Sequence, residues 1–204
     1  QVVTWNPELY TDAIGEALTA AAETHGVRVT TLWAGYPGPA VWNFTEGPRT
    51  IGLVPPEYRE MRVEALQKGA RFAARFGLPS ITTHVGFLPE DPNDPLYEGT
   101  VEALAAVVAV CREVDVDFCF ETGQETPVTL LRTIERLGVD RLGVNLDTAN
   151  VILYGKANPV DALDVFGRYV MGTHIKDGLY PTNGTELGRE VAVGQGKVDF
   201  PRLI

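Results

Sequence analysis

The chain has 204 residues, of which 45% are hydrophobic and 22% charged, as expected for a globular protein with one buried core. Its net charge of −10 argues against a nucleic-acid binder, since such proteins usually present a basic face to the phosphates. The sequence shows neither a signal peptide nor a run near the ~18 apolar residues of a membrane span. Cys111 and Cys119 lack metal-type spacing and are interpreted as buried, reduced thiols. We therefore expect a cytoplasmic protein.

Short β-rich runs alternate with helical patterns along the chain. The expected strands are apolar without clean alternation, which is typical of parallel strands buried on both faces. They span residues 1–5, 27–34, 80–86, 116–122, 142–147 and 169–175. Helices are expected at 56–76, where Met61 should be buried, and at 97–114. Further helices should begin where a capping side chain precedes proline, at Asn6-Pro7, Thr126-Pro127 and Asn158-Pro159.

Alternating strand–helix units predict an α/β fold with a parallel sheet, formed by one domain over residues 1–204. Because six strands cannot close an eight-stranded barrel, we expect an incomplete (β/α)8 TIM barrel. Its first βα unit and last strand would be missing. Such a fragment has two unpaired edges, so we expect it to aggregate and to bind metal weakly when expressed alone. An open, doubly wound sheet of six strands is the alternative.

Three of the expected strands end in a polar side chain. They lie in VDFCFETG (116–123), LGVNLDTAN (142–150) and VMGTHIKD (170–177), and the polar residues are Glu121, Asp147 and His174. Equivalent strand ends converge in a parallel barrel, and carboxylates with an imidazole suit Mn²⁺, Mg²⁺, Co²⁺ or Zn²⁺. We expect their ligating atoms to lie about 3–5 Å apart around one ion. The alternative roles are a structural ion pair for Glu121, a helix cap for Asp147 and a core histidine for His174.

Other polar and aromatic residues stand near the same expected mouth. His84, in TTHVG, is interpreted as a substrate contact, although it could also be a metal ligand or a core histidine. Trp33 flanks the loop AGYPGP and would stack on a sugar ring, with plain loop packing as the alternative. Lys176 and Arg189 are either substrate contacts or solvated charges. The GQG at 194–196 resembles half of a phosphate-binding loop, which is a weak signal.

Four motifs in order resemble the sugar phosphate isomerase/epimerase proteins of the xylose isomerase-like TIM-barrel superfamily. They are FETG (120–123), NLDTAN (145–150), THIKDG (173–178) and VGQGKVDFPRLI (193–204). The resemblance implies one divalent ion held by Glu, Asp, His and a second Glu. Glu121, Asp147 and His174 match the first three, and the fourth is expected after Ile204. Similar epimerases usually carry a histidine where this chain has Asn150, which is interpreted as a substrate contact.

The same resemblance implies a metal-dependent isomerase of carbohydrate metabolism, acting on a sugar or sugar phosphate. The reaction would move a proton next to a ketose carbonyl through a metal-stabilised enediolate, with Glu121 as the base. A cyclic-polyol (inosose-type) dehydratase with the same site, a DNA endonuclease and a non-catalytic sugar-binding protein are the alternatives. The endonuclease would need a basic groove and more histidines than the three present. We expect no nucleic-acid or membrane partner, and a homo-oligomer is left open.

Overall fold

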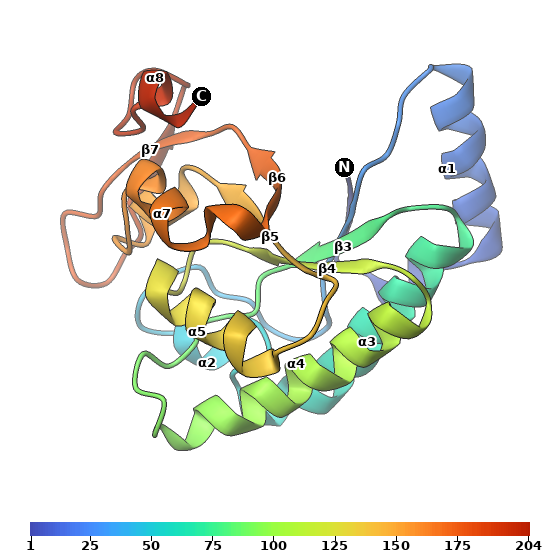
Figure 1. Cartoon of the computed structure of the whole chain (residues 1–204), viewed down its shortest axis with the longest axis horizontal. Coiled ribbons are helices and arrows are strands. Elements are labelled where there is room, and N and C mark those ends of the chain that lie inside the picture. Colours follow the sequence, from blue (N-terminus) through green and yellow to red (C-terminus); the bar gives the residue numbers. More distant parts are fainter.

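The computed structural model describes residues 1–204, and its centre is one parallel sheet of six strands in sequence order. The strands are β1 (Val2–Thr4), β2 (Leu32–Ala34), β3 (Ser80–Thr83), β4 (Asp117–Glu121), β5 (Leu142–Asp147) and β6 (Val170–His174). Every neighbouring pair is parallel. The sheet curls, and its edge strands β1 and β6 do not pair with each other (Figure 1). Because the strand order never reverses, the chain forms part of a TIM barrel and not a doubly wound sheet.

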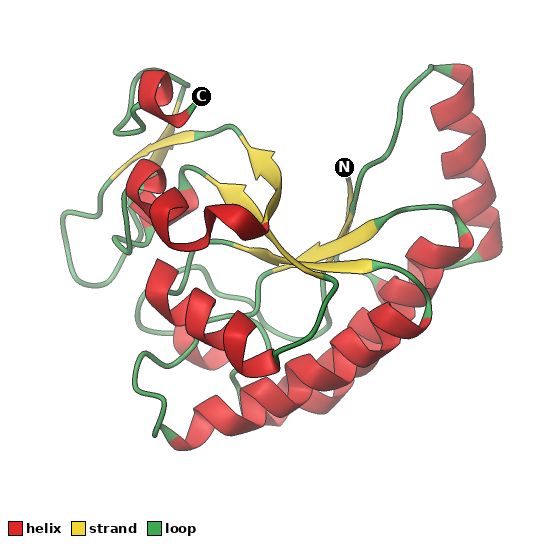
Figure 2. Ribbon diagram, in the orientation of Figure 1, coloured by secondary structure: helices red, strands yellow, loops and turns green.

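Helices connect the strands and cover the outer side of the sheet, as Figure 2 shows for the long helices. The main ones are α1 (Asp12–Thr24), α3 (Pro56–Arg75), α4 (Pro95–Glu113), α5 (Pro127–Leu137) and α7 (Pro159–Phe166). Shorter ones are α2 (Gly47–Thr50), α6 (Asn150–Leu153) and α8 (Phe200–Leu203), with 3₁₀ turns at Pro7–Leu9 and Gly167–Tyr169. Thr126 and Asn158 cap α5 and α7 as predicted. Asn6-Pro7 begins only a 3₁₀ turn, and α1 starts later, at Asp12.

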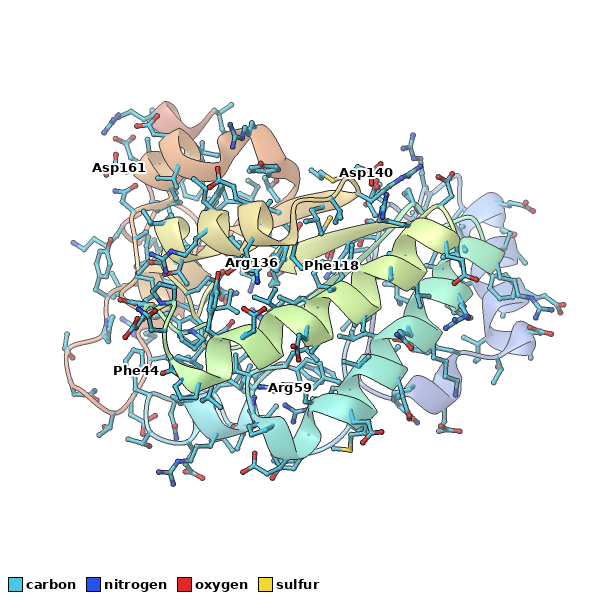
Figure 3. All side chains as sticks on the ribbon, turned by 60° about the horizontal axis from the view of Figure 1, so that its bottom comes forward. Phe44, Arg59, Phe118, Arg136, Asp140 and Asp161 are labelled. Atoms are coloured by element: carbon cyan, nitrogen blue, oxygen red, sulfur yellow. The ribbon has the colours of Figure 1, made fainter.

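The core lies between the sheet and the helices α3, α4 and α5. Ile81, Phe118 and Val144 are fully buried there, and Figure 3 shows Phe118 of β4 behind α4. Strands β2, β3 and β5 are buried along their whole length, whereas residues of the edge strands β1 and β6 are partly exposed. Both cysteines are buried and unpaired. No helix is long and apolar enough to span a membrane.

Three local predictions were wrong. The expected strand 27–34 is extended in the sheet only at Leu32–Ala34. No strand was expected over residues 178–198, but they contain most of an antiparallel hairpin, β7 (Asp177–Leu179) with β8 (Arg189–Val191). Met61 is exposed, and its neighbour Arg62 is fully buried instead. Arg62 turns inward because its guanidinium donates to the carbonyl oxygens of residues 37, 39 and 52 and so holds the 35–54 segment in place.

Candidate metal centre

Glu121, Asp147 and His174 are the last residues of β4, β5 and β6, and their side chains converge. One ligand atom from each lies within 4.8 Å of the others. His174 Nδ1 is 2.9 Å from Glu121 Oε1 and 3.5 Å from Asp147 Oδ2. Both carboxylates are buried, at 3% and 0% exposure. The structure therefore brings together the three residues that the sequence pattern singled out, at the spacing that one small ion requires.

The two oxygens of Asp147 have different surroundings. Oδ1 accepts the backbone N–H groups of Ala149 and Asn150, both at 3.0 Å, and so caps the start of α6. Oδ2 is buried and makes no hydrogen bond of normal geometry, while the Lys176 ammonium lies 2.9 Å away. Burial alone would raise the pKa of Asp147, but His174 and Lys176 outweigh it and lower the pKa. A buried, anionic oxygen that faces the ligand atoms of Glu121 and His174 fits a divalent cation.

Asn145 belongs to this centre although the sequence analysis did not single it out. Its Nδ2 donates to Glu121 Oε2 over 2.6 Å, and both side chains are buried. Asn145 stands two residues before Asp147 on β5, so both side chains point to the same side of the strand. The two-residue spacing from Asp147 was the sequence signal that could have identified Asn145. The hydrogen bond fixes the Glu121 carboxylate, whose other oxygen faces His174.

In the metal-free protein, His174 is expected to titrate with a pKa of about 9, because the nearby carboxylates of Asp147 and then Glu121 stabilise its charged form. Since this pKa is raised above the ordinary 6.5, the stabilisation is complete below pH 6.5 and is lost as the pH rises through about 9. The free energy of unfolding should therefore fall across that window. Imidazole NMR measures the His174 pKa, and urea unfolding at several pH values measures the stability, both in the presence of a chelator. A pKa near 6.5 with flat stability would contradict it.

Lys176 places a positive charge beside the oxygen of Asp147 that faces the centre. The ammonium also lies 3.4 Å from Glu190 on β8, so it has a second anionic partner. A divalent ion entering the site meets this like charge, and Lys176→Met should tighten Mn²⁺ binding on the order of tenfold in calorimetry. Lys68→Met is the control, since Lys68 pairs with Glu8 on the surface. Unchanged or weaker binding in Lys176→Met would show that the lysine does not oppose the ion.

A cavity of about 770 Å³ opens over the three residues. Trp33, His84, Asn150 and Lys176 line it, as the sequence analysis proposed for substrate contacts. All three tryptophans of the chain line it, and Trp5 and Trp33 lie 4.8 Å apart between ring centres. The predicted contact Arg189 does not line the cavity, because it belongs to β8, where it is exposed and pairs with Leu179. Trp5 and Tyr154 also line the cavity, although the sequence analysis proposed neither as a site residue.

The GQG segment at 194–196 does not present its amides to a phosphate. The buried carboxylate of Asp177 accepts the N–H groups of Gly194 and Gly196, at 2.9 and 2.7 Å. It also accepts those of Gly178 and Val198, at 2.9 and 3.1 Å. Burial would raise the pKa of Asp177, but these four donors outweigh it and lower the pKa. The glycine-rich segment is thus an internal loop around Asp177.

Asp177→Asn should destabilise the chain by about 3–5 kcal/mol, because two backbone N–H groups would lose a charged acceptor and face an NH₂ group instead. Urea or thermal unfolding measures this loss. Asp199→Asn is the control, since the exposed Asp199 side chain accepts only the N–H of Arg202. Similar small losses in both variants would show that Asp177 does not hold the loop.

The xylose isomerase-like TIM barrel family model matches residues 2–204. Among solved structures, a xylose isomerase domain protein from Planctomyces limnophilus is 35% identical, with a TM-score of 0.93. The match covers 100% of this chain and 73% of that one. Among curated proteins, the uncharacterized protein YihM of Escherichia coli (strain K12) is 26% identical over 124 residues. That match covers 54% of this chain and 36% of YihM, so the chain corresponds to about a third of this relative.

More distant structures share the fold alone. A D-tagatose 3-epimerase-like protein is 13% identical with a TM-score of 0.76, over 99% of this chain and 74% of that one. A xylose isomerase-like TIM barrel protein from Mycobacterium smegmatis in complex with magnesium is 15% identical with a TM-score of 0.67, over 95% and 66%. The probable 3-DHS dehydratase AsbF of Bacillus anthracis is 15% identical with a TM-score of 0.71, over 100% and 76%.

Proposed function

The chain belongs to the xylose isomerase-like TIM-barrel family, and we propose on this basis that it is a metal-dependent isomerase or epimerase of a sugar or sugar phosphate. The observation that carries the proposal is the convergence of Glu121, Asp147 and His174 within 4.8 Å beneath a cavity lined by tryptophan. His174 and Lys176 offset part of the cost of burying two carboxylates, and a divalent cation would offset it further. Aromatic faces around that cation suit the C–H faces of a sugar ring.

Glu121, Asp147 through Oδ2, and the His174 imidazole would hold one Mn²⁺, Mg²⁺, Co²⁺ or Zn²⁺ ion. When bound, the ion supplies Lewis-acid stabilisation of the negative charge that develops on a ketose oxygen. The donor set of two carboxylates and one imidazole does not select among these ions. Asp147 is held for this task by its Oδ1 hydrogen bonds, which leave Oδ2 as the oxygen directed at the centre.

The proton transfer is assigned to Glu121. Asn145 fixes one of its oxygens, so the carboxylate is held in one orientation at the cavity floor. From there it takes the proton from the carbon next to the carbonyl. Lys176 lines the same cavity and donates hydrogen bonds to substrate oxygens, while Trp5, Trp33 and Trp42 exclude water. Since the amides of Gly194 and Gly196 are used by Asp177, a free ketose is favoured over a phosphate ester.

A dehydratase of a cyclic polyol is the second candidate. It begins with the same proton abstraction beside a carbonyl, and then needs a proton donor for the departing hydroxyl group. The ammonium of Lys176, 2.9 Å from Asp147 Oδ2 at the cavity wall, is such a donor. The two reactions differ in their products, because only the dehydratase releases water.

The proposal is tested by loading the chain with each of the four metals and incubating it with ketoses, ketose phosphates and an inosose. Chromatography with mass detection separates the outcomes. The expected result is a metal-dependent isomer or epimer with the mass of its substrate. A product lighter by one water would assign the dehydratase instead. No product from any substrate, with metal shown to be bound, would overturn both candidates.

A further inference from the structure

A second polar group lies in the wall of the same cavity. It consists of His84, Gln124 and Tyr154, whose exposures are only 6%, 1% and 4%. His84 follows β3, Gln124 lies in the loop between β4 and α5, and Tyr154 follows α6. His84 and Tyr154 line the cavity together with Glu121, Asp147 and His174. Three segments of the chain therefore bring buried polar atoms to one place beside the metal centre.

The hydrogen bonds within this group are incomplete. His84 Nδ1 donates to Gln124 Oε1 over 3.1 Å, so the second ring nitrogen of His84 is left as an acceptor. Burial lowers the pKa of His84, which keeps the ring neutral. Gln124 Nε2 and the Tyr154 hydroxyl are buried close to each other, and neither makes a hydrogen bond of normal geometry. Buried polar groups are rarely left unpaired, and those at a cavity wall are natural contacts for a ligand.

Aromatic packing prevents these side chains from turning to other partners. The Tyr154 ring contacts Phe44 and Phe87 edge-on, with centres 6.4 and 5.7 Å away. The His84 ring is held by Trp33 and Trp42, at 5.7 and 5.1 Å. The available atoms are thus one neutral acceptor, one amide donor and one hydroxyl, all fixed in place. A neutral alcohol group, which both donates and accepts, is the partner that matches this set.

We propose that His84, Gln124 and Tyr154 form a hydroxyl-binding subsite. One alcohol of the ligand donates to the free ring nitrogen of His84 and accepts from the Tyr154 hydroxyl or the Gln124 amide. Gln124 is a positioning residue, because its Oε1 holds the His84 ring in the tautomer that accepts. This inference rests on the proposed function, since it takes the ligand to be a polyhydroxylated ketose held at the metal centre. The subsite then selects ketoses by the position of one hydroxyl.

The test compares Tyr154→Phe with Tyr10→Phe, because both hydroxyls are buried without partners but only Tyr154 lines the cavity. Without ligand, both variants should be as stable as the parent or more so, since each removes an unpaired polar group. D-fructose, D-tagatose and their monodeoxy analogues are then titrated into the Mn²⁺-loaded protein and followed by tryptophan fluorescence. Tyr154→Phe should weaken binding of the parent ketose about tenfold, and Tyr10→Phe should not.

The monodeoxy analogues identify the hydroxyl. One analogue should bind Tyr154→Phe and the parent protein equally well, because the contacted alcohol is already absent. If Tyr154→Phe weakens the binding of every analogue equally, or of none, the proposed subsite is overturned. Destabilisation of ligand-free Tyr154→Phe would do the same, since the hydroxyl would then have a structural role.

Two variants of Gln124 test its positioning role. Gln124→Met removes the acceptor for His84 and should weaken binding of the parent ketose. It should not weaken binding of the monodeoxy analogue that lacks the contacted hydroxyl. Gln124→Glu keeps an acceptor and should raise the His84 pKa in imidazole NMR. At a pH above that raised pKa, where the free ring nitrogen of His84 still accepts, Gln124→Glu should bind the parent ketose better than Gln124→Met. Equal ketose binding by the two variants would refute the positioning role of Gln124.

If the protein binds ketoses but does not convert them, the proposed function is refuted, and the binding comparison still tests the subsite. Conversion with no spared analogue would refute the subsite alone.

Discussion

Asp147→Asn is expected to weaken Mn²⁺ binding by about 100-fold or more in calorimetry. The substitution keeps the shape of the side chain and the oxygen that accepts the N–H groups of Ala149 and Asn150. It replaces Oδ2, the oxygen directed at Glu121 and His174, by an NH₂ group that cannot bind a cation. Asp147→Asn should therefore weaken metal binding without unfolding the start of α6.

Asp140→Asn is the matched control for this experiment. Asp140 pairs with Arg112 on the outer surface and precedes β5, whereas Asp147 is the last residue of that strand. Its substitution should leave the affinity for Mn²⁺ unchanged and alter stability by less than about 1 kcal/mol, as expected for an exposed ion pair. Equal metal affinity in Asp147→Asn and the unaltered chain would mean that Asp147 is not a ligand.

Glu121→Gln is expected to lower turnover by about 10³-fold and to abolish exchange of the substrate C–H with solvent deuterium. A glutamine fills the same buried space but cannot take a proton. Proton NMR in D₂O follows the exchange on whichever ketose the chain converts. Turnover by the unaltered chain without deuterium uptake would instead indicate a hydride shift or a shielded proton.

Glu125→Gln provides the control within the same loop. Burial raises the pKa of Glu125 to about 8, so this carboxyl group is mostly protonated at neutral pH and resembles an amide. Its substitution should change turnover little. If Glu125→Gln and Glu121→Gln lose activity equally, the proton transfer cannot be assigned to Glu121.

The positions of Glu121, Asp147 and His174 could be predicted because they depend on regular structure. Each follows an apolar run, and runs separated by one helix become neighbouring parallel strands whose ends meet. Local capping was equally predictable, as the ends of α5 show: Thr126 caps its start and Gly138 ends it with a φ of 60°. In both cases a short stretch of sequence determines the outcome.

Residues whose roles depend on loop conformation could not be predicted in this way. The contact of His84 with Gln124 joins positions 40 residues apart, and no periodic pattern reports it. Arg62 was missed because an arginine in a helical pattern is normally exposed, whereas its burial here is set by three carbonyl groups of the 35–54 segment. The GQG motif was ambiguous for a related reason. Glycine amides can bind a phosphate or an internal carboxylate, and Asp177 accepts them here.

Diffraction at the manganese absorption edge, from crystals soaked in Mn²⁺, locates the ion directly. We predict one anomalous peak, about 2.2 Å from oxygens of Glu121 and Asp147 and from the His174 imidazole. The Lys176 ammonium should then lie farther from Asp147 Oδ2 than its present 2.9 Å. A peak at any other carboxylate cluster, or no peak between these three residues at saturating Mn²⁺, would contradict a metal-dependent function for this site.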